Sequence, residues 1–346
     1  MSQRQVGAAV GLAVASGVLA AVSLVGGASA DAAHRAMSAV PAVGSLNAIA
    51  CPTSTDCIAV GSDTNLNGKS SVVHTANAVA SVWPGTLLSH PLAAVACAIP
   101  TDCVAVAVGA TVRVTVASGA SSLAGALHPP SGQIAPLGSV ACPNPTECFA
   151  VGFEGTEGHS KALLAHLSAS GAILGTTLEG TRSGFAGIVC PTSTLCLLAA
   201  ANLTHPEMVQ MLVNGHLGGG HLLAPSTYIQ ALACYKAVAC YALAGRTTAQ
   251  KTDLLYPISP TTGAIGAART IGGGFSGDGI ACPTANQCLV VGFNGARKPA
   301  VVIATRGAPS GPRAVAGTGL SGIGCTEAGA CFGVGQDSAV GLVERV

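Results

Sequence analysis

Seven pairs of cysteines, each with five residues between its two members, recur along this chain at nearly even intervals. The first cysteines of successive pairs are 46, 45, 48, 44, 48 and 43 residues apart. A fixed period of this size is typical of repeat proteins, in which each unit buries its apolar face against its neighbours. The pairs are Cys51/Cys57, Cys97/Cys103, Cys142/Cys148, Cys190/Cys196, Cys234/Cys240, Cys282/Cys288 and Cys325/Cys331.

Short apolar stretches flank every pair, such as "LNAIAC" before the first pair and "IAVG" after it. Clusters of Gly, Pro, Asn and Ser bound these stretches, and such clusters separate strands. Apolar residues do not recur at helical spacing without an interrupting Gly or Pro, and Glu and Lys are scarce. The repeat therefore predicts strands rather than the helices of HEAT-type units of similar length.

Four strands are expected in each repeat: one ends at the first cysteine, one begins at the second, and two lie in the variable remainder. The first repeat shows them as "LNAIAC", "CIAVG", "SSVVHTA" and "AVASVW". Seven such units predict an all-β fold, a seven-bladed β-propeller. The apolar run Cys103–Val112 is too short to span a bilayer and is expected to form one strand. Gly272–Gly279 is expected to be a flexible loop between blades.

The two ends of the repeat region are expected to share one blade. After Cys331 only 15 residues remain, enough for a second and a third strand but not for a fourth. The segment His34–Val43 stands where other repeats place their fourth strand. We therefore expect the N-terminal segment to complete the last blade, which closes the ring and covers two sheet edges.

A disulfide across each hairpin is the simplest role for the C-x5-C pairs, because facing residues of antiparallel strands lie close together. The even cysteine count and the regular pairing favour it. Zinc sites prefer C-x2-4-C with further ligands, and redox motifs prefer C-x-x-C, so both alternatives fit less well. Disulfides are expected to stabilise cores built from Ala, Gly and Val, which bury little apolar area per residue.

The N-terminus has the pattern of a secretory signal peptide. Arg4 precedes an uncharged stretch, and the small residues Ala28–Ala30 precede Asp31. We expect a signal peptide over residues 1–30, cleaved after Ala30, and a propeller over residues 31–346. The alternative is an uncleaved anchor, because the apolar run is longer than usual. Both readings place the protein outside the cell or at its surface.

The phrases "CPTSTDCIAVG", "CPNPTECFAVG" and "CPTANQCLVVG" resemble the blades of secreted β-propeller repeat proteins of actinobacteria, which carry C-P-x4-C-x-A-V-G. The resemblance covers about residues 31–346. It implies the propeller fold and an exported location, and members of this group mostly have no assigned activity. The repeats that begin at Cys97, Cys234 and Cys325 lack the proline after the first cysteine.

One local motif suggests a metal site. Asp63, Asn65, Asn67 and Gly68 match the opening of an oxygen-rich calcium loop. His74, however, stands where such a loop requires a bidentate Glu. A hairpin loop that turns at Asn67 and Gly68 explains the same residues and is favoured. No cofactor is expected, with calcium at this loop as the alternative.

Catalytic motifs are not found. The nine histidines do not form H-E-x-x-H, and no serine lies in G-x-S-x-G. The closest histidine pairs, His159/His166 and His216/His221, are expected to be strand or loop residues. Several of the 14 acidic residues are expected inside the hairpin turns, namely Asp56, Asp102 and Glu147.

A non-catalytic binding or scaffold module is the function that fits these observations. The partner is expected to be a protein or a cell-envelope component, and the chain to be a monomer. Charged residues make up 8% of the sequence and the net charge is +1, which gives no basis for binding nucleic acid or a membrane surface beyond the N-terminal segment. The alternatives are a hydrolase or lyase with its site at the channel mouth, and a structural component of a cell wall or spore coat.

Overall fold

The computed structural model describes residues 37–40, 43–63, 69–76, 79–83, 88–130, 133–156, 159–180, 182–201, 207–247, 252–337 and 340–346. The expected signal peptide, residues 1–30, lies outside these residues. Asn65 and Asn67 of the expected calcium loop also lie outside them. The strands belong to one unit, Arg35–Val346.

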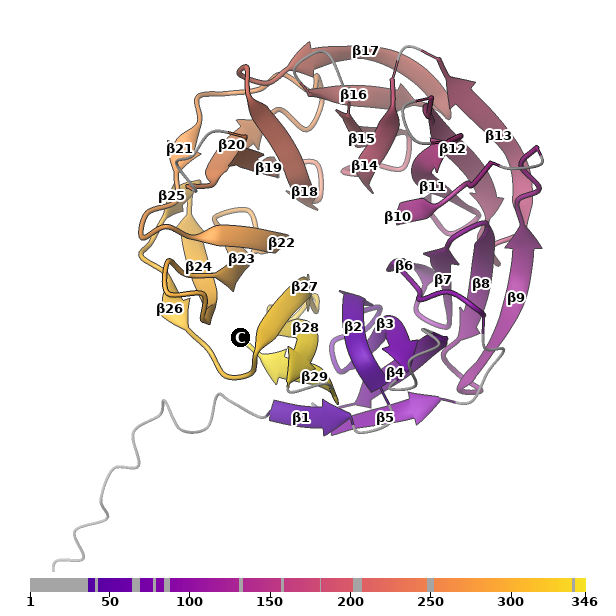
Figure 1. Cartoon of the computed structure of the whole chain (residues 1–346), viewed down its shortest axis with the longest axis horizontal. Helices are drawn as coiled ribbons and strands as arrows, with labels where there is room; N and C mark the ends of the chain where they lie inside the picture. The colour runs from indigo at the N-terminus through magenta and orange to yellow at the C-terminus, as the bar shows by residue number, and fades with distance from the viewer. Residues whose placement is uncertain are drawn as a thin grey trace, which may run out of the picture. The chain divides into compact units, whose positions relative to one another are not determined.

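Seven antiparallel sheets stand around a central channel in this unit, and each sheet is one blade of a propeller (Figure 1). The first blade consists of β2 (Val43–Ala50), β3 (Asp56–Asp63), β4 (Ser70–Ala76) and β5 (Val79–Trp83). The second consists of β6 (Ala94–Ile99), β7 (Asp102–Ala107), β8 (Ala110–Thr115) and β9 (Ala120–Ala126). The third consists of β10 (Leu137–Asn144), β11 (Glu147–Glu154), β12 (Lys161–Ser168) and β13 (Ile173–Glu179).

The fourth and fifth blades are β14 (Gly184–Val189), β15 (Leu195–Ala201), β16 (Met208–Val213) and β17 (His216–Leu222); β18 (Thr227–Tyr235), β19 (Ala239–Arg246), β20 (Leu254–Ile258) and β21 (Arg269–Thr270). The sixth blade is β22 (Ser276–Thr284), β23 (Gln287–Phe293) and β24 (Pro299–Thr305), with the outer pieces β25 (Ala308–Pro309) and β26 (Arg313–Ala314). The seventh is β27 (Gly319–Cys325), β28 (Cys331–Asp337), β29 (Val340–Arg345) and β1 (Met37–Val40).

The seventh blade joins both ends of the repeat region, as the sequence predicts. Its strand order is β1-β29-β28-β27, and β1 pairs antiparallel with β29 from Met37 opposite Glu344 to Val40 opposite Gly341. In Figure 1 the N-terminal strand β1 lies beside the yellow C-terminal strand β29. The expected fold, a closed ring of seven sheets, is therefore confirmed.

The core lies within the sheets and between neighbouring blades. The second strand of each blade is buried almost throughout; in β3, the side chains of Cys57, Ile58, Ala59 and Val60 are fully buried. Neighbouring blades share apolar clusters, such as the one that contains Leu243 of β19 with residues of β23. These clusters mix Ala, Val and Cys with larger Leu, Ile and Phe side chains.

The glycine that ends the "AVG" phrase is explained by a close contact between the first two strands. A Cβ atom at this position would lie 1.9 to 2.1 Å from a backbone oxygen near the start of the first strand. That distance is far below van der Waals contact, so a side chain there would force the strands apart. The four glycines are Gly61, Gly152, Gly292 and Gly335.

Two expectations about chain segments are wrong. The run Cys103–Val112 is not one strand, because it belongs to both β7 and β8. Gly109 between them adopts a left-handed φ of 65°, which lets two buried strands follow each other without a polar loop. The segment Gly272–Gly279 is only partly a loop, since β22 begins at Ser276. Within the described residues, no helix is long and apolar enough to cross a membrane.

Candidate functional site

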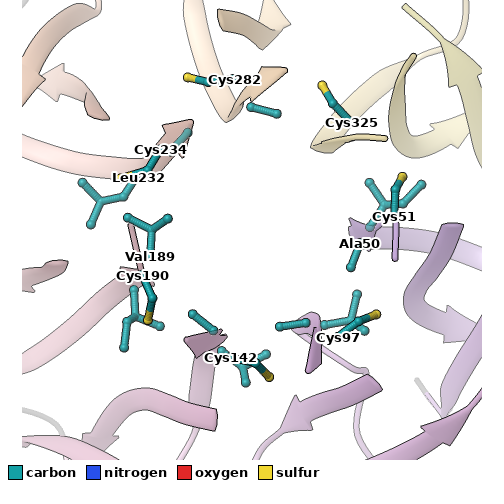
Figure 2. A pocket seen from close by; sticks show the side chains of 18 of the residues that line it. Ala50, Cys51, Cys97, Cys142, Val189, Cys190, Leu232, Cys234, Cys282 and Cys325 are labelled. Atoms are coloured by element: carbon teal, nitrogen blue, oxygen red, sulfur yellow. The ribbon is translucent and has the colours of Figure 1, made fainter. Parts of the chain in front are cut away.

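The first strand of each blade is the innermost (Figure 1), and residues near the ends of all seven first strands lie together at one mouth of the channel. A cavity of about 460 Å³ lies at this mouth and is lined by residues of all seven blades. The lining consists of backbone, disulfide sulfur and apolar side chains, with no titratable group among its residues. Figure 2 shows Val189 and Leu232 at the edge of the opening. We call the side of the ring that carries this mouth the disulfide face.

Every C-x5-C pair forms a disulfide, as predicted, and each disulfide joins the end of a first strand to the start of a second. In three blades the two cysteines face each other directly in the strand register. The seven turns that border the mouth are therefore covalently closed. The bonds join Cys51 to Cys57, Cys97 to Cys103, Cys142 to Cys148, Cys190 to Cys196, Cys234 to Cys240, Cys282 to Cys288 and Cys325 to Cys331.

The two cysteines of each disulfide lie in different surroundings, a difference that the sequence, which treats all 14 alike, does not reveal. The first cysteine of each pair lines the mouth. The second is a core residue outside this lining, because it opens the buried second strand, and its exposure ranges from 0% for Cys57 to 3% for Cys331. Cys240 and Cys288, for example, are both 2% exposed and belong to apolar clusters between blades. The buried members are Cys57, Cys103, Cys148, Cys196, Cys240, Cys288 and Cys331.

An acidic residue precedes the second cysteine in the first three blades, where the sequence places acids inside the hairpin turns. The structure instead makes each acid the first residue of the second strand, and each pairs with a base on the third strand. This pairing cross-links the two strands beside the disulfide. The pairs are Asp56 Oδ1–His74 Nε2 at 3.1 Å, Asp102 Oδ1–Arg113 Nη2 at 2.6 Å and Glu147 Oε2–His166 Nε2 at 2.9 Å.

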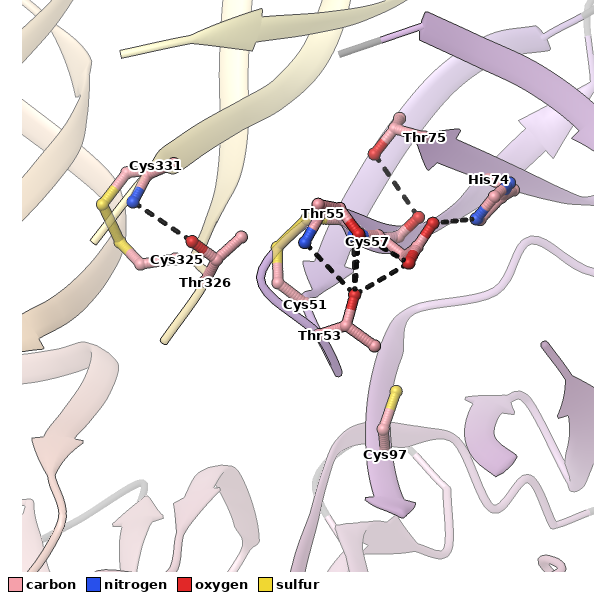
Figure 3. The surroundings of a disulfide bond; sticks show 12 residues. Cys51, Thr53, Thr55, Cys57, His74, Thr75, Cys97, Cys325, Thr326 and Cys331 are labelled. Carbon is pink, nitrogen blue, oxygen red and sulfur yellow. Dashed lines mark hydrogen bonds and ion pairs between the residues drawn. A yellow bond between two sulfur atoms is a disulfide. The ribbon is translucent and has the colours of Figure 1, made fainter. Parts of the chain in front are cut away.

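The Asp56 carboxylate has more side-chain partners than the other two acids, and Figure 3 labels these partners, Thr53, Thr55 and His74. Its Oδ2 accepts hydrogen bonds from the hydroxyls of Thr53 at 2.8 Å and Thr55 at 2.9 Å. The Thr53 hydrogen bond is the largest influence on the pKa of Asp56; with those from Thr55 and His74 it outweighs burial and lowers the pKa below its ordinary value. The turn "TSTD" is therefore ordered by its own side chains.

The histidines of these pairs also stack on aromatic rings. The His74 ring lies 4.6 Å from the Trp83 ring, and the His166 ring lies 4.9 Å from the Phe149 ring. The expected placement of histidines holds, since His166 lies in β12 and His216 and His221 lie in β17. In the part of the chain that the structure describes, no three His, Cys, Asp or Glu side chains are grouped so as to hold a metal ion.

A second cavity, of about 490 Å³, lies between the third and fourth blades and includes Glu147, His166 and His216. Glu147 uses one carboxylate oxygen for His166 and the other for the side-chain amide of Asn144, at 2.7 Å. Because both oxygens already accept hydrogen bonds, this pair fixes the sheet rather than offering a free base. The sequence alone did not reveal this cavity, because its lining is divided between two blades and the fourth blade supplies more than half of it.

Two carboxylates from neighbouring blades lie at the end of the channel strands that is remote from the disulfides, on what we call the opposite face. Asp278 is the extra residue where the β22–β23 register shifts between Gly277 and Gly279. Asp278 is exposed on one side, but the protein packed around its carboxyl group reduces the hydration of that group. This desolvation is the larger cause, and the negative charge of Asp253 the smaller one, that raises the pKa of Asp278 to about 6. Asp253 is 4% exposed and accepts a hydrogen bond from the Gly277 N–H at 2.5 Å. Burial also raises the pKa of Asp253.

Of the three residues expected to bind calcium, Asp63 alone lies within the described part of the chain. Asp63 ends β3, and its N–H donates to the Lys69 carbonyl at 2.8 Å. His74, at the position of the calcium-binding Glu, faces Ile58 in the strand register. Ile58 is five residues from Asp63 along β3, which corresponds to roughly 16 Å of strand. His74 therefore belongs to the pair with Asp56, and calcium binding at Asp63, Asn65 and Asn67 stays a prediction.

Comparison with known proteins shows the fold. No family model matches the chain, and no curated protein matches it by sequence. Solved propellers superpose on most of it. The WD40 β-propeller domain of Doa1 has a TM-score of 0.61 at 10% identity, over 89% of this chain and 95% of that chain. YCF48 bound to D1 peptide has a TM-score of 0.61 at 10% identity, over 90% and 96%. YCF48 from Cyanidioschyzon merolae has a TM-score of 0.59 at 12% identity, over 90% and 98%.

Proposed function

We propose that this chain is an exported, non-catalytic binding module that engages a protein or cell-envelope component through the mouth on the disulfide face. The observation that carries the proposal is the lining of this mouth. Seven closed turns surround an uncharged opening of about 460 Å³ that presents backbone polar groups as well as apolar side chains, and its lining residues offer no acid, base or nucleophile. A rigid, uncharged rim of this kind binds by shape, burial and backbone hydrogen bonds, and it loses little conformational entropy on binding.

The solved propellers support a binding role by analogy only. YCF48, one of the superposed propellers, was solved with a D1 peptide bound. Propellers present loops and strand ends on a rigid ring, which suits recognition of other macromolecules. We extend this use of the fold to the present chain, with a monomeric ring as the binding unit.

Export is the second part of the proposal. Seven disulfides and no free cysteine among the described residues are typical of proteins that fold in an oxidising compartment. The N-terminal pattern and the likeness of the cysteine phrases to secreted actinobacterial propellers agree with this location. N-terminal sequencing of protein recovered from the culture medium is expected to begin at Asp31. A chain recovered only from the cytoplasm would refute export.

The binding role is tested by capturing partners from the extracellular and envelope fractions with the mature protein as bait. Leu232→Glu places a charge at the mouth and is expected to abolish capture of the specific partner. Leu123→Glu is the matched control, because Leu123 is 50% exposed on the outer strand β9. Equal loss with both variants, or no loss with either, would contradict a site at the mouth.

An enzyme remains the second candidate, and one observation favours it. Asp253 and Asp278 both have raised pKa values and come from neighbouring blades. A carboxyl group that stays protonated near pH 6 is suited to act as a general acid in a hydrolase or lyase. A screen of glycoside and ester substrates with wild type and Asp278→Asn separates the candidates, since only an enzyme would lose activity in the variant.

A further inference from the structure

Positive charge is concentrated in and around the sixth blade. Residues 269–318 contain five of the 15 Lys and Arg residues of the chain but only one of the 14 Asp and Glu residues, Asp278. All five cationic side chains are exposed. They are Arg269, Arg297, Lys298, Arg306 and Arg313. This blade therefore differs from the rest of a nearly neutral protein.

Three chain segments meet at one corner of the opposite face and bring four of these cations there. The Gly295 N–H donates to the Gly273 carbonyl at 3.1 Å, which joins the loop before β22 to the loop after β23. Gly273 also packs on Pro312, since a Cβ atom at Gly273 would lie 2.9 Å from the Pro312 Cγ. The joined segments carry Arg269, Arg297, Lys298 and Arg313.

The turn that presents Arg297 and Lys298 is held in one conformation. The side-chain oxygen of Asn294 accepts hydrogen bonds from the N–H of Ala296 at 3.0 Å and of Lys298 at 3.1 Å. The Arg297 N–H donates to the Asn294 carbonyl at 2.8 Å. The backbone that carries the two cations is therefore ordered before any ligand binds, which lowers the entropic cost of binding.

A cavity lies beside this turn, and we call it the blade-six pocket. Its volume is about 580 Å³, which falls within the range of roughly 300–1,000 Å³ typical of ligand pockets. Phe293 supplies an apolar wall, and Arg297 supplies a cation at the edge. Backbone and small polar groups complete the lining. The lining residues are Gly274, Ser276, Phe293, Asn294, Gly295 and Arg297.

Among the described residues, no carboxylate forms an ion pair with the cations around the pocket. The three ion pairs among the described residues involve His74, Arg113 and His166. None of the five cations of residues 269–318 therefore has a carboxylate of the described residues within 4.0 Å. Like charges gathered at one corner repel each other. An anionic ligand would relieve this repulsion, and the local positive potential would attract it.

We propose that the blade-six pocket and its cations bind an acidic peptide segment of a partner protein. Asp or Glu side chains of the peptide would pair with Arg297 and Lys298, and an apolar side chain would lie against Phe293. The apolar wall favours a peptide over a polymer of uronate or phosphate units, which has no apolar side chain to place there. This site lies on the face remote from the disulfide mouth and is independent of binding at that mouth.

The test uses fluorescence anisotropy of a short fluorescein-labelled peptide in which Asp and Glu alternate with Leu and Phe. Wild-type protein is expected to bind it, and Arg297→Glu is expected to weaken binding at least about tenfold, one decade in Kd. Arg306→Glu is the matched control. Both arginines are exposed and occupy turns with positive φ, 57° for Arg297 and 50° for Arg306, but Arg306 follows β24 at the disulfide-face end of the blade. Binding to the control is expected to stay within about twofold of wild type.

Three outcomes would overturn the proposal: the same affinity for Arg297→Glu and Arg306→Glu, equal binding of a peptide with Asn and Gln in place of Asp and Glu, or binding of polyphosphate or polygalacturonate without binding of the acidic peptide. Thermal unfolding of both variants checks that each is folded. Partner capture at the disulfide face is measured separately with Leu232→Glu, so failure of one site leaves the result for the other intact.

Discussion

Gly152 of β11 lies directly against the backbone of Pro136, so closely that a Cβ atom on Gly152 would be 1.9 Å from the Pro136 carbonyl oxygen. The same contact recurs in three other blades. Because of this contact, the residue that ends the "AVG" phrase must lack a side chain for the first strand to pack against the second. This requirement explains why the sequence repeats the glycine.

Gly152→Ala is therefore expected to destabilise the protein by about 1–3 kcal/mol, the usual cost of forcing an extra carbon into a packed site. Gly138→Ala is the control, because a Cβ atom at Gly138 would meet nothing within 4 Å. Urea unfolding measures both variants. Equal stability of the two would show that the strands separate without cost.

Replacing one disulfide by serines, as in the double variant Cys142→Ser with Cys148→Ser, is expected to cost about 2–2.5 kcal/mol, the chain-entropy value for so short a loop. The remaining bridges are expected to stay within their blades, because each joins neighbouring strands. Urea unfolding measures the loss, and mass spectrometry of non-reduced peptides checks the bridges. Linkages between blades would contradict the assignment.

Removal of residues 1–40 is expected to open the ring, since β29 then loses its partner β1 and exposes a row of backbone donors and acceptors. Light scattering should show association, and thermal unfolding should lose cooperativity. Removal of residues 1–35 keeps β1 and serves as the control. A monomer with unchanged unfolding after the longer deletion would show that the seam does not stabilise the ring.

Asp278 is expected to make the protein less stable as pH rises. Its pKa is about 6 in the folded state against an ordinary value of 3.8, so between these values the folded state retains a proton that the unfolded state has lost. Stability therefore falls as pH rises through this window. Asp278→Asn should be more stable than wild type at neutral pH, and the difference should vanish below pH 3.8. A constant difference across the whole range would contradict the shift.

Asp56 is expected to have the opposite effect. Its folded pKa lies below the ordinary value of 3.8, so its contribution is present above that value and is lost as pH falls through the folded pKa. Asp56→Asn should lower stability at neutral pH by less than about 1 kcal/mol, because the carboxylate is partly exposed. Parallel unfolding curves for wild type and variant at neutral and acidic pH test this, and a difference that grows on acidification would refute it.

Much of the fold could be predicted because the C-x5-C spacing and its flanking apolar stretches repeat seven times. The cysteine spacing gives the blade number and the disulfides, and the short tail after Cys331 predicts that the segment with Met37–Val40 completes the last blade. The turn at Gly109 was missed because two buried strands follow each other without a polar break, so their apolar letters read as one run.

The site features were harder to predict because they join different repeats or variable strands. The bases His74, Arg113 and His166 lie on third strands, whose spacing from the cysteines varies, so their pairing with the acids could not be derived. Asp253 and Asp278 are 25 residues apart in sequence and meet only through neighbouring blades. The cations around Arg297 converge through loops that the period does not describe.

Because β1 pairs with β29, the repeating unit of the sequence does not coincide with a blade. Counted from β1, each unit contains the outer strand of one blade followed by the first three strands of the next blade. A duplicated or deleted stretch of one period would therefore begin and end inside a sheet, and the flanking strands could still pair across the junction. Rings with one sheet more or fewer are thus reachable in a single genetic step without leaving an unpaired border, which gives this architecture a simple route to change its diameter.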